Sequence, residues 1–156
     1  MPASRTVRAI DREHLDALVV ALAAVSDRVI GPTVEAGAIV LAEIASAAAL
    51  PYGVRDVQAP GKVRLEERAQ EKGKEPSAFG YVNGPRSAKD WLFPAREQLY
   101  SAERRPDGRI GFRATPVASP RTALLGVRAC DVAAVRRQDR ILLQGLHADA
   151  RYAARR

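Results

Sequence analysis

Metal-binding residue types are scarce in this sequence of 156 residues, which contains one cysteine and two histidines. A single thiol excludes an internal disulfide. It also excludes a complete iron–sulfur or zinc site within the chain, because such sites need about four ligands. His14 and His147 lie far apart, and neither is followed by a metal ligand three or four positions later. We therefore predict no complete metal site, with Cys130 at most a lone ligand to a group held elsewhere.

Long apolar runs and aromatic residues are also lacking. No run of about 18 apolar residues is found, so the sequence predicts no membrane-spanning helix. The first residues lack the apolar core of a secretion signal, which favours a cytoplasmic protein. Aromatic residues make up 5% of the chain and hydrophobic residues 47%, so the core must consist mainly of Ala, Val, Leu and Ile. The length suits a single domain, 1–156, with a core of its own.

Negative charge is in deficit, and the formal net charge is +7. Such a balance fits an acidic protein partner, an anionic membrane surface or nucleic acid. The arginines are scattered rather than gathered in a tail, and aromatic residues do not alternate with them. A basic nucleic-acid-binding protein is therefore kept as the second alternative only. Residues 121–156 hold eight Arg and three Asp, a formal +5, which makes this segment the best candidate for a docking surface.

A helix beginning at Asp131 would divide its side chains between the core and this surface. Helical spacing predicts that its apolar residues point inward, namely Val132, Val135, Ile141 and Leu142. Its arginines would then point outward, namely Arg136, Arg137 and Arg140. Two interpretations stay open: a solvated helix face, or a docking face for an acidic partner.

The apolar patterns predict an α/β or α+β fold with a mixed β-sheet flanked by helices. Strands are expected at 29–34, 38–44, 62–66, 79–82, 110–117 and 122–127. The last strand is predicted to be central because it is apolar on both faces. Helices are expected at 11–27, within an N-terminal unit 1–28, and at 88–93, 95–103, 131–144 and 148–156. The charged segment 66–78 is predicted to be a solvated loop, and 53–61 an irregular one.

The candidate site is the predicted turn from the last strand into the helix that follows, at residues 126–131. A helix N-terminus offers unpaired N–H groups and a partial positive charge, which lower the pKa of a thiol or hold an anion. Cys130 is either a small buried residue at this junction or a thiolate that contacts a cofactor. Arg128 either binds a phosphate or carboxylate, or forms an ion pair with Asp131 or Asp139. Asp131 is itself the expected N-cap.

A second loop leads into the helix predicted at 88–93. Arg86 and Lys89 follow Gly84 and Pro85 there, and they are either a second edge of the anion site or a solvated helix start. The loop lacks the spacing of a P-loop, and the chain contains no Gly-x-Gly-x-x-Gly motif. The tentative cofactor-binding residues are therefore Arg128, Cys130, Asp131 and Lys89, and no catalytic residue is predicted.

Three segments, taken in order, carry a family resemblance. The first is Val29-Ile30-Gly31-Pro32 with Gly37 to Val40, Glu43 and Ile44; the second is Gly84 to Lys89 with Leu92-Phe93-Pro94, Glu97 and Leu99; the third is Gly126 to Asp131 with Ala134, Asp139, Arg140, Asp149, Tyr152 and Arg155. Together they resemble the N-terminal half of the iron–sulfur electron-transfer subunit of sulfhydrogenases (beta chain) and anaerobic sulfite reductases (A chain). In that family, a ferredoxin-like half with Cys-x-x-Cys-x-x-Cys runs follows and carries two [4Fe–4S] clusters.

The resemblance implies an electron-transfer subunit, or a truncated part of one, in a hydrogenase or sulfite reductase complex. Such a chain would be a non-catalytic docking scaffold and would bind no cluster alone. Its expected partners are a flavoprotein that carries FAD and the hydrogenase or sulfite reductase subunit. The first alternative is a small anion- or nucleotide-binding module that uses Arg128, Cys130 and Asp131. The sequence leaves open the terminal electron donor or acceptor, the oligomeric state and whether the cluster-binding half is lost by truncation.

Overall fold

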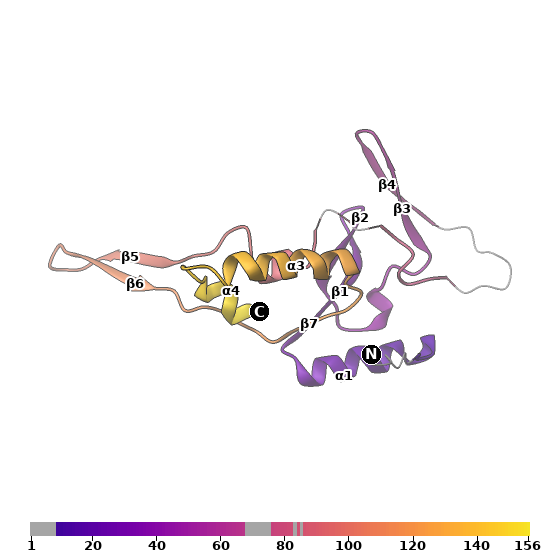
Figure 1. Cartoon of the computed structure of the whole chain (residues 1–156), viewed down its shortest axis with the longest axis horizontal. Coiled ribbons are helices and arrows are strands. Elements are labelled where there is room, and N and C mark those ends of the chain that lie inside the picture. Colours follow the sequence, from indigo (N-terminus) through magenta and orange to yellow (C-terminus); the bar gives the residue numbers. More distant parts are fainter. Residues whose placement is uncertain (1–8, 68–75, 83, 85) are drawn as a thin grey trace.

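The structure is a computed structural model that describes residues 9–67, 76–82, 84 and 86–156. Its described part is α+β, as predicted: short helices surround a small mixed sheet, and two hairpins extend away from it (Figure 1). No helix in this part of the chain is long and apolar enough to cross a membrane.

The sheet has three strands in the order β2-β1-β7. β1 (Arg28–Glu35) pairs antiparallel with β2 (Ala38–Glu43) and parallel with β7 (Thr122–Leu124). The β1–β2 hairpin was predicted, and it closes through Ala36 and Gly37, whose φ angles are +48° and +76°. A two-residue turn with positive φ at both positions matches the twist of the strands that it joins.

The prediction that residues 122–127 form the central strand is wrong, because β7 lies at the edge of the sheet and β1 lies in the middle. The strand also ends early, at Leu124. Its residues are apolar on both faces for another reason. Ala123 and Leu125 pack against the core cluster around Val19, whereas Leu124 packs against the cluster around Ile30 on the opposite face. Two covered faces therefore do not require a central position.

The helices cover the sheet and build the core in three clusters. α1 (Leu15–Val25), preceded by the short turn η1 (Arg12–His14), packs with η2 (Ala47–Ala49) on one face. The single helical turn α2 (Lys89–Leu92) covers the other face. The third cluster joins α2 to the two C-terminal helices and contains Leu92, Val135 and Tyr152. Those helices are α3 (Ala129–Leu142) and α4 (Ala150–Arg155), close to the predicted ranges.

Two hairpins form separate two-stranded sheets, so the prediction that six strands join in one sheet is wrong. The first consists of β3 (Val54–Ala59) and β4 (Lys62–Glu67), joined by Pro60 and Gly61. The irregular loop predicted there is instead the strand β3. The second consists of β5 (Tyr100–Arg104) and β6 (Ile110–Ala114). Both hairpins project from the body of the protein in different directions (Figure 1).

Two further predictions fail for physical reasons. Residues 79–82 form bends rather than a strand, because their backbone groups bind side chains: the Val82 N–H donates to Asp56 and the Tyr81 carbonyl accepts from Arg128. The helix predicted at 95–103 is replaced by β5, which pairs with β6 through a turn at residues 106–108. Cross-strand pairing outweighs the local helix propensity here.

The solvated loop predicted at 66–78 falls largely outside the described residues, since 68–75 are not among them. Its ends differ from the prediction. Glu66 and Glu67 belong to β4, and Ala78 is buried in the cluster around Val19.

Candidate functional site

The turn from β7 into α3 is shaped by Gly126, whose φ is +74°. A Cβ atom at this position would lie 2.9 Å from the Phe79 ring, so glycine is required both for conformation and for space. The helix then begins at Ala129 with Arg128 as its N-cap. Asp131 is the third helical residue, and its carboxylate accepts the Arg128 backbone N–H at 3.4 Å. The prediction that Asp131 is the N-cap is therefore wrong, although it supports the same helix end from inside.

The Arg128 side chain ties this turn to a distant segment. Its guanidinium carbon lies 4.8 Å from the centre of the Tyr81 ring, and it donates a hydrogen bond to the Tyr81 carbonyl. Burial raises the pKa of the Tyr81 hydroxyl, and the nearby Arg128 charge opposes this by less. Of the interpretations left open for Arg128, an ion pair with Asp139 is wrong, because that carboxylate accepts from Tyr152 and Arg156 instead. Arg128 thus fastens residues 79–82 against the start of α3.

Asp56 of β3 belongs to the same neighbourhood. Burial opposes its ionisation, but the Val82 N–H at 2.6 Å, the Gln58 side chain and the Arg128 charge together hold the pKa of this carboxyl below its usual range. Charges of both signs therefore surround the turn.

Cys130 lies at the second position of α3 and is exposed, so the interpretation as a small buried residue is wrong. The reason is geometric: α3 buries Val135, whereas the neighbours Ala129 and Cys130 at its start are both exposed. The thiol is accessible to solvent and to reagents.

A small cleft brings together several of the predicted residues. Gly84, Arg86, Gly126 and Asp131 line it, with Tyr81 and residues of the β1–β2 hairpin, and its volume is about 20 Å³. This space suits a water molecule, whereas sites for small organic ligands are about 300–1,000 Å³. Lys89 is not among the lining residues; it is exposed at the start of α2, where Arg86 pairs with Asp90 at 3.6 Å. The loop before α2 and the turn before α3, predicted as two edges of an anion site, therefore do line one cleft. The loop contributes Arg86 rather than Lys89.

One basic face of α3 matches the prediction. Arg136, Arg137 and Arg140 are exposed and, with Ala129, Val132 and Ala133, line an open hollow of about 500 Å³. The predicted inward set is correct only in part. Val135 is buried and Leu142 half-buried, but Val132 and Ile141 have exposed fractions of 42% and 73%. Only the side of α3 that meets α2 and α4 is covered, and these two residues lie off it.

An arrangement that sequence reasoning missed lies at α4. Glu97 accepts from Arg151 at 2.6 Å and from Arg155, while Arg151 also donates to the Thr115 carbonyl at 2.7 Å. Arg155 donates further to the Ala118 carbonyl at 3.3 Å. We call Glu97, Arg151 and Arg155 the clamp. Arg155 first, and Arg151 next, hold the pKa of the Glu97 carboxyl below its usual range. Glu97 and Arg155 belong to the resembling segments, which was the only signal available.

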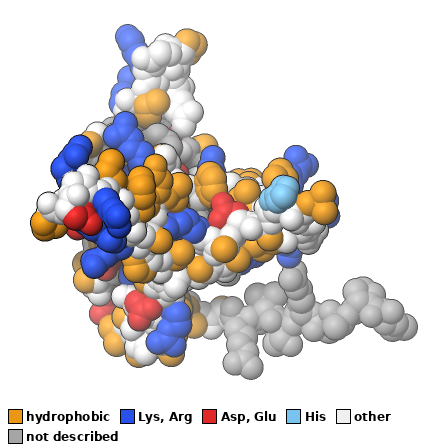
Figure 2. Space-filling view, turned by 90° about the vertical axis from the view of Figure 1, so that its left-hand side faces the viewer, with side chains coloured by type: hydrophobic (Ala, Val, Ile, Leu, Met, Phe, Trp, Pro, Cys, Tyr) orange, Lys and Arg blue, Asp and Glu red, His pale blue; other side chains and the backbone are white. Residues whose placement is uncertain are grey.

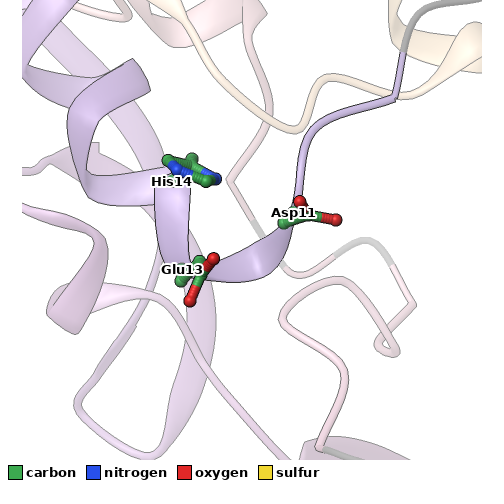
Figure 3. Close-up of side chains that lie close together, drawn as sticks. All are labelled: Asp11, Glu13 and His14. Atoms are coloured by element: carbon green, nitrogen blue, oxygen red, sulfur yellow. The ribbon is translucent and has the colours of Figure 1, made fainter.

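Three potential metal ligands gather before α1, namely Asp11, Glu13 and His14 (Figure 3). Their ligand atoms all lie within 4.8 Å of one another, and all three residues are exposed. The sequence prediction considered ligands only after His14, whereas Asp11 lies three positions before it. Exposed acidic groups on a single short turn are common in proteins without a metal, so this cluster assigns no function.

Comparison with known proteins adds no relative: no family model matches the chain, and no curated protein or solved structure is significantly similar to it.

Proposed function

We propose that this chain is a docking subunit, without catalytic activity of its own, of a redox complex of the hydrogenase or sulfite reductase type. It would hold an iron–sulfur protein and a flavoprotein in position for electron relay. The redox assignment rests on the three resembling segments. The docking role is supported by one observation above all, the basic face of α3.

That face combines charge with small apolar residues. Arg136, Arg137 and Arg140 have no carboxylate partner among the described residues, and they are exposed and line the same hollow as Ala133 and Val132. Arginine is enriched at protein interfaces because it contributes both a charge and an apolar stem. Ferredoxin-type partners are commonly acidic, and complementary charge steers their encounter.

The extent of the surface supports the same proposal. The whole chain exposes 11910 Å², whereas a compact monomer of this mass exposes about 7,700 Å². Subtracting about 160 Å² for each residue outside the described part still leaves an excess of about 1,300 Å². Interfaces of permanent complexes reach this size.

The test is the association of the purified chain with an acidic ferredoxin that carries two [4Fe–4S] clusters, followed by stopped flow at about 20 to 300 mM salt. Arg136→Gln/Arg137→Gln/Arg140→Gln should slow association about tenfold at low salt and flatten its salt dependence. The matched control is Arg55→Gln/Lys62→Gln/Arg64→Gln, which removes the same charge from the β3–β4 hairpin.

The control should keep most of the wild-type rate. If both triple variants slowed association equally, the net charge of the chain would explain the effect, and the docking face would be rejected. Unchanged ferredoxin association, together with lost binding of a 20-base-pair DNA duplex, would favour nucleic-acid binding instead.

A further inference from the structure

The β5–β6 hairpin has one apolar face that nothing in the described part of the chain covers. The strand register places Tyr100 opposite Ala114, Ala102 opposite Phe112 and Arg104 opposite Ile110, so these side chains share a face. Tyr100, Ile110 and Phe112 have exposed fractions of 60%, 56% and 71%. We call these six residues the arm face. Tyr100 and Phe112 meet edge to face, with ring centres 5.8 Å apart.

The protein holds this hairpin by its root rather than by its faces. Arg151 and Arg155 of α4 bind Glu97, which precedes β5. They also donate to the Thr115 and Ala118 carbonyls, which follow β6, so α4 fastens both ends of the hairpin. A two-stranded hairpin is marginally stable in water by itself. With both roots clamped, the hairpin projects away from the body (Figure 1), and Tyr100, Ile110 and Phe112 of the arm face are exposed.

Charge narrows the choice of partner. Residues 100–114 carry four arginines, Arg104, Arg105, Arg109 and Arg113, against Glu103 and Asp107. The one ion pair between members of this group, Arg109 to Asp107, spans 3.9 Å and is exposed. Figure 2 looks onto this end of the molecule, where hydrophobic and basic side chains lie side by side. A complementary surface is apolar in its centre and bears carboxylates at its rim.

Other occupants fit less well. A second copy would bring together two basic arms of chains with net charge +7, which repel each other. Nucleic acid is favoured by flat rings that offer free faces to bases. Here the two rings pack edge to face, and alanine and isoleucine make up half of the arm face.

We propose that the β5–β6 hairpin is a docking arm whose apolar face seats in an apolar groove rimmed by carboxylates on an acidic partner protein. The inference rests on the proposed function and adds a second contact, separate from the basic face of α3. The two contacts divide the work: the arginines of α3 govern the encounter, and the arm face governs how long the complex lasts.

The test compares Phe112→Ser with Val63→Ser, which removes another exposed apolar side chain, 62% exposed, from the β3–β4 hairpin. The probe is the acidic ferredoxin used above. Phe112→Ser should raise the dissociation rate about tenfold and leave the association rate and its salt dependence unchanged. Val63→Ser should change neither rate. In the wild type, the ferredoxin should also slow amide hydrogen exchange in β5 and β6.

Amide hydrogen exchange of unbound Phe112→Ser shows whether β5 and β6 still pair in this variant. If they do not, Ile110→Ser provides a second test. An unchanged dissociation rate in both variants, or no protection of β5 and β6 by the ferredoxin, would overturn the arm. An effect of Phe112→Ser on self-association or on binding of a DNA duplex, without one on ferredoxin, would overturn it as well. The α3 triple variant tests the association rate, whereas the arm variants test the dissociation rate. A failure of the proposed function is therefore distinguishable from a failure of the arm.

Discussion

The two projecting hairpins share a backbone architecture but differ in what their side chains leave exposed. On β3–β4, Glu66 accepts from Arg55 at 3.2 Å and from Arg64 at 2.7 Å, and Gln58 donates to Asp56 at 2.7 Å. On β5–β6, aromatic and aliphatic side chains occupy the corresponding exposed surface. The polar side chains of the first hairpin bind one another, across the strands in Arg55–Glu66 and along one strand in the other two pairs. The second hairpin instead exposes apolar area that a partner can bury. The exposed face, rather than the strand pairing, therefore separates a solvated hairpin from a docking hairpin.

The largest expected effect comes from Tyr152→Ala at the base of one hairpin only. Tyr152 is fully buried between α2, α3 and α4, and its hydroxyl donates to Asp139 at 2.8 Å. Loss of the ring leaves a cavity that costs about 3–4 kcal/mol and loosens α4, which carries the clamp. Urea unfolding measures the loss. Hydrogen exchange should accelerate in β5–β6 much more than in β3–β4, and equal acceleration would show that the two hairpins share one anchor.

An intermediate effect is expected from Glu97→Gln, which removes the charge of the clamp. Because the pKa of Glu97 is lowered in the folded protein by Arg155 and then Arg151, its contribution is present above the ordinary value of 4.5 and is lost as the pH falls through the lowered pKa. Wild-type β5–β6 should therefore lose protection below about pH 4.5, where protection is the exchange rate relative to that of an unfolded chain at the same pH. The Gln variant should be poorly protected already at neutral pH, with little further loss on acidification.

Glu66→Gln is the matched control for this prediction. The pKa of Glu66 is lowered by Arg64 and then Arg55, in the same direction as that of Glu97. This variant should loosen β3–β4 and leave the pH response of β5–β6 intact. A pH response of β5–β6 that survives Glu97→Gln would assign it to a carboxyl outside the clamp.

The smallest effect is expected from Ala36→Asn in the third hairpin, β1–β2, which belongs to the core. Ala36 has φ +48°, a conformation that costs most L-residues about 1 kcal/mol and that asparagine tolerates better. An Asn-Gly pair also suits this turn. The variant should gain about 0.5–1 kcal/mol in urea unfolding, with hydrogen exchange of both projecting hairpins unchanged. Destabilisation would mean that the exposed turn makes a contact through its methyl group.

The sequence predicted those elements whose pattern is decided nearby. These elements are the buried strand β1, the turn at Gly37 and the periodic helices α1 and α3. Each depends on residues close to it in the sequence. Residues 79–82 and 95–103 failed because distant groups decide them. Arg128 donates a hydrogen bond to the Tyr81 carbonyl, 47 residues earlier in the chain. β6 pairs with β5 across an intervening turn.

The candidate site follows the same rule. The turn at Gly126 and the outward arginines of α3 were predicted from local spacing. The clamp was not predicted, because Arg155 and Glu97 are 58 residues apart. Taken alone, each is a charged residue of a kind common on a helix or a loop. Exposure of Cys130 also depends on which side of α3 meets α2 and α4, which no local pattern records.

The parallel pairing of β7 with β1 has a consequence for how the chain folds. The Arg28 side chain donates to Thr122 across 94 residues, so the pairing of these strands closes a loop that contains both projecting hairpins. The free-energy cost of closing such a loop grows only with the logarithm of its length, and a change of about 15 residues alters it by roughly 0.15 kcal/mol. Local hairpins form in microseconds, so both can exist before the ends of this loop meet. The core therefore fixes where each hairpin begins and ends, while the length and surface of each can change at little thermodynamic cost to the core.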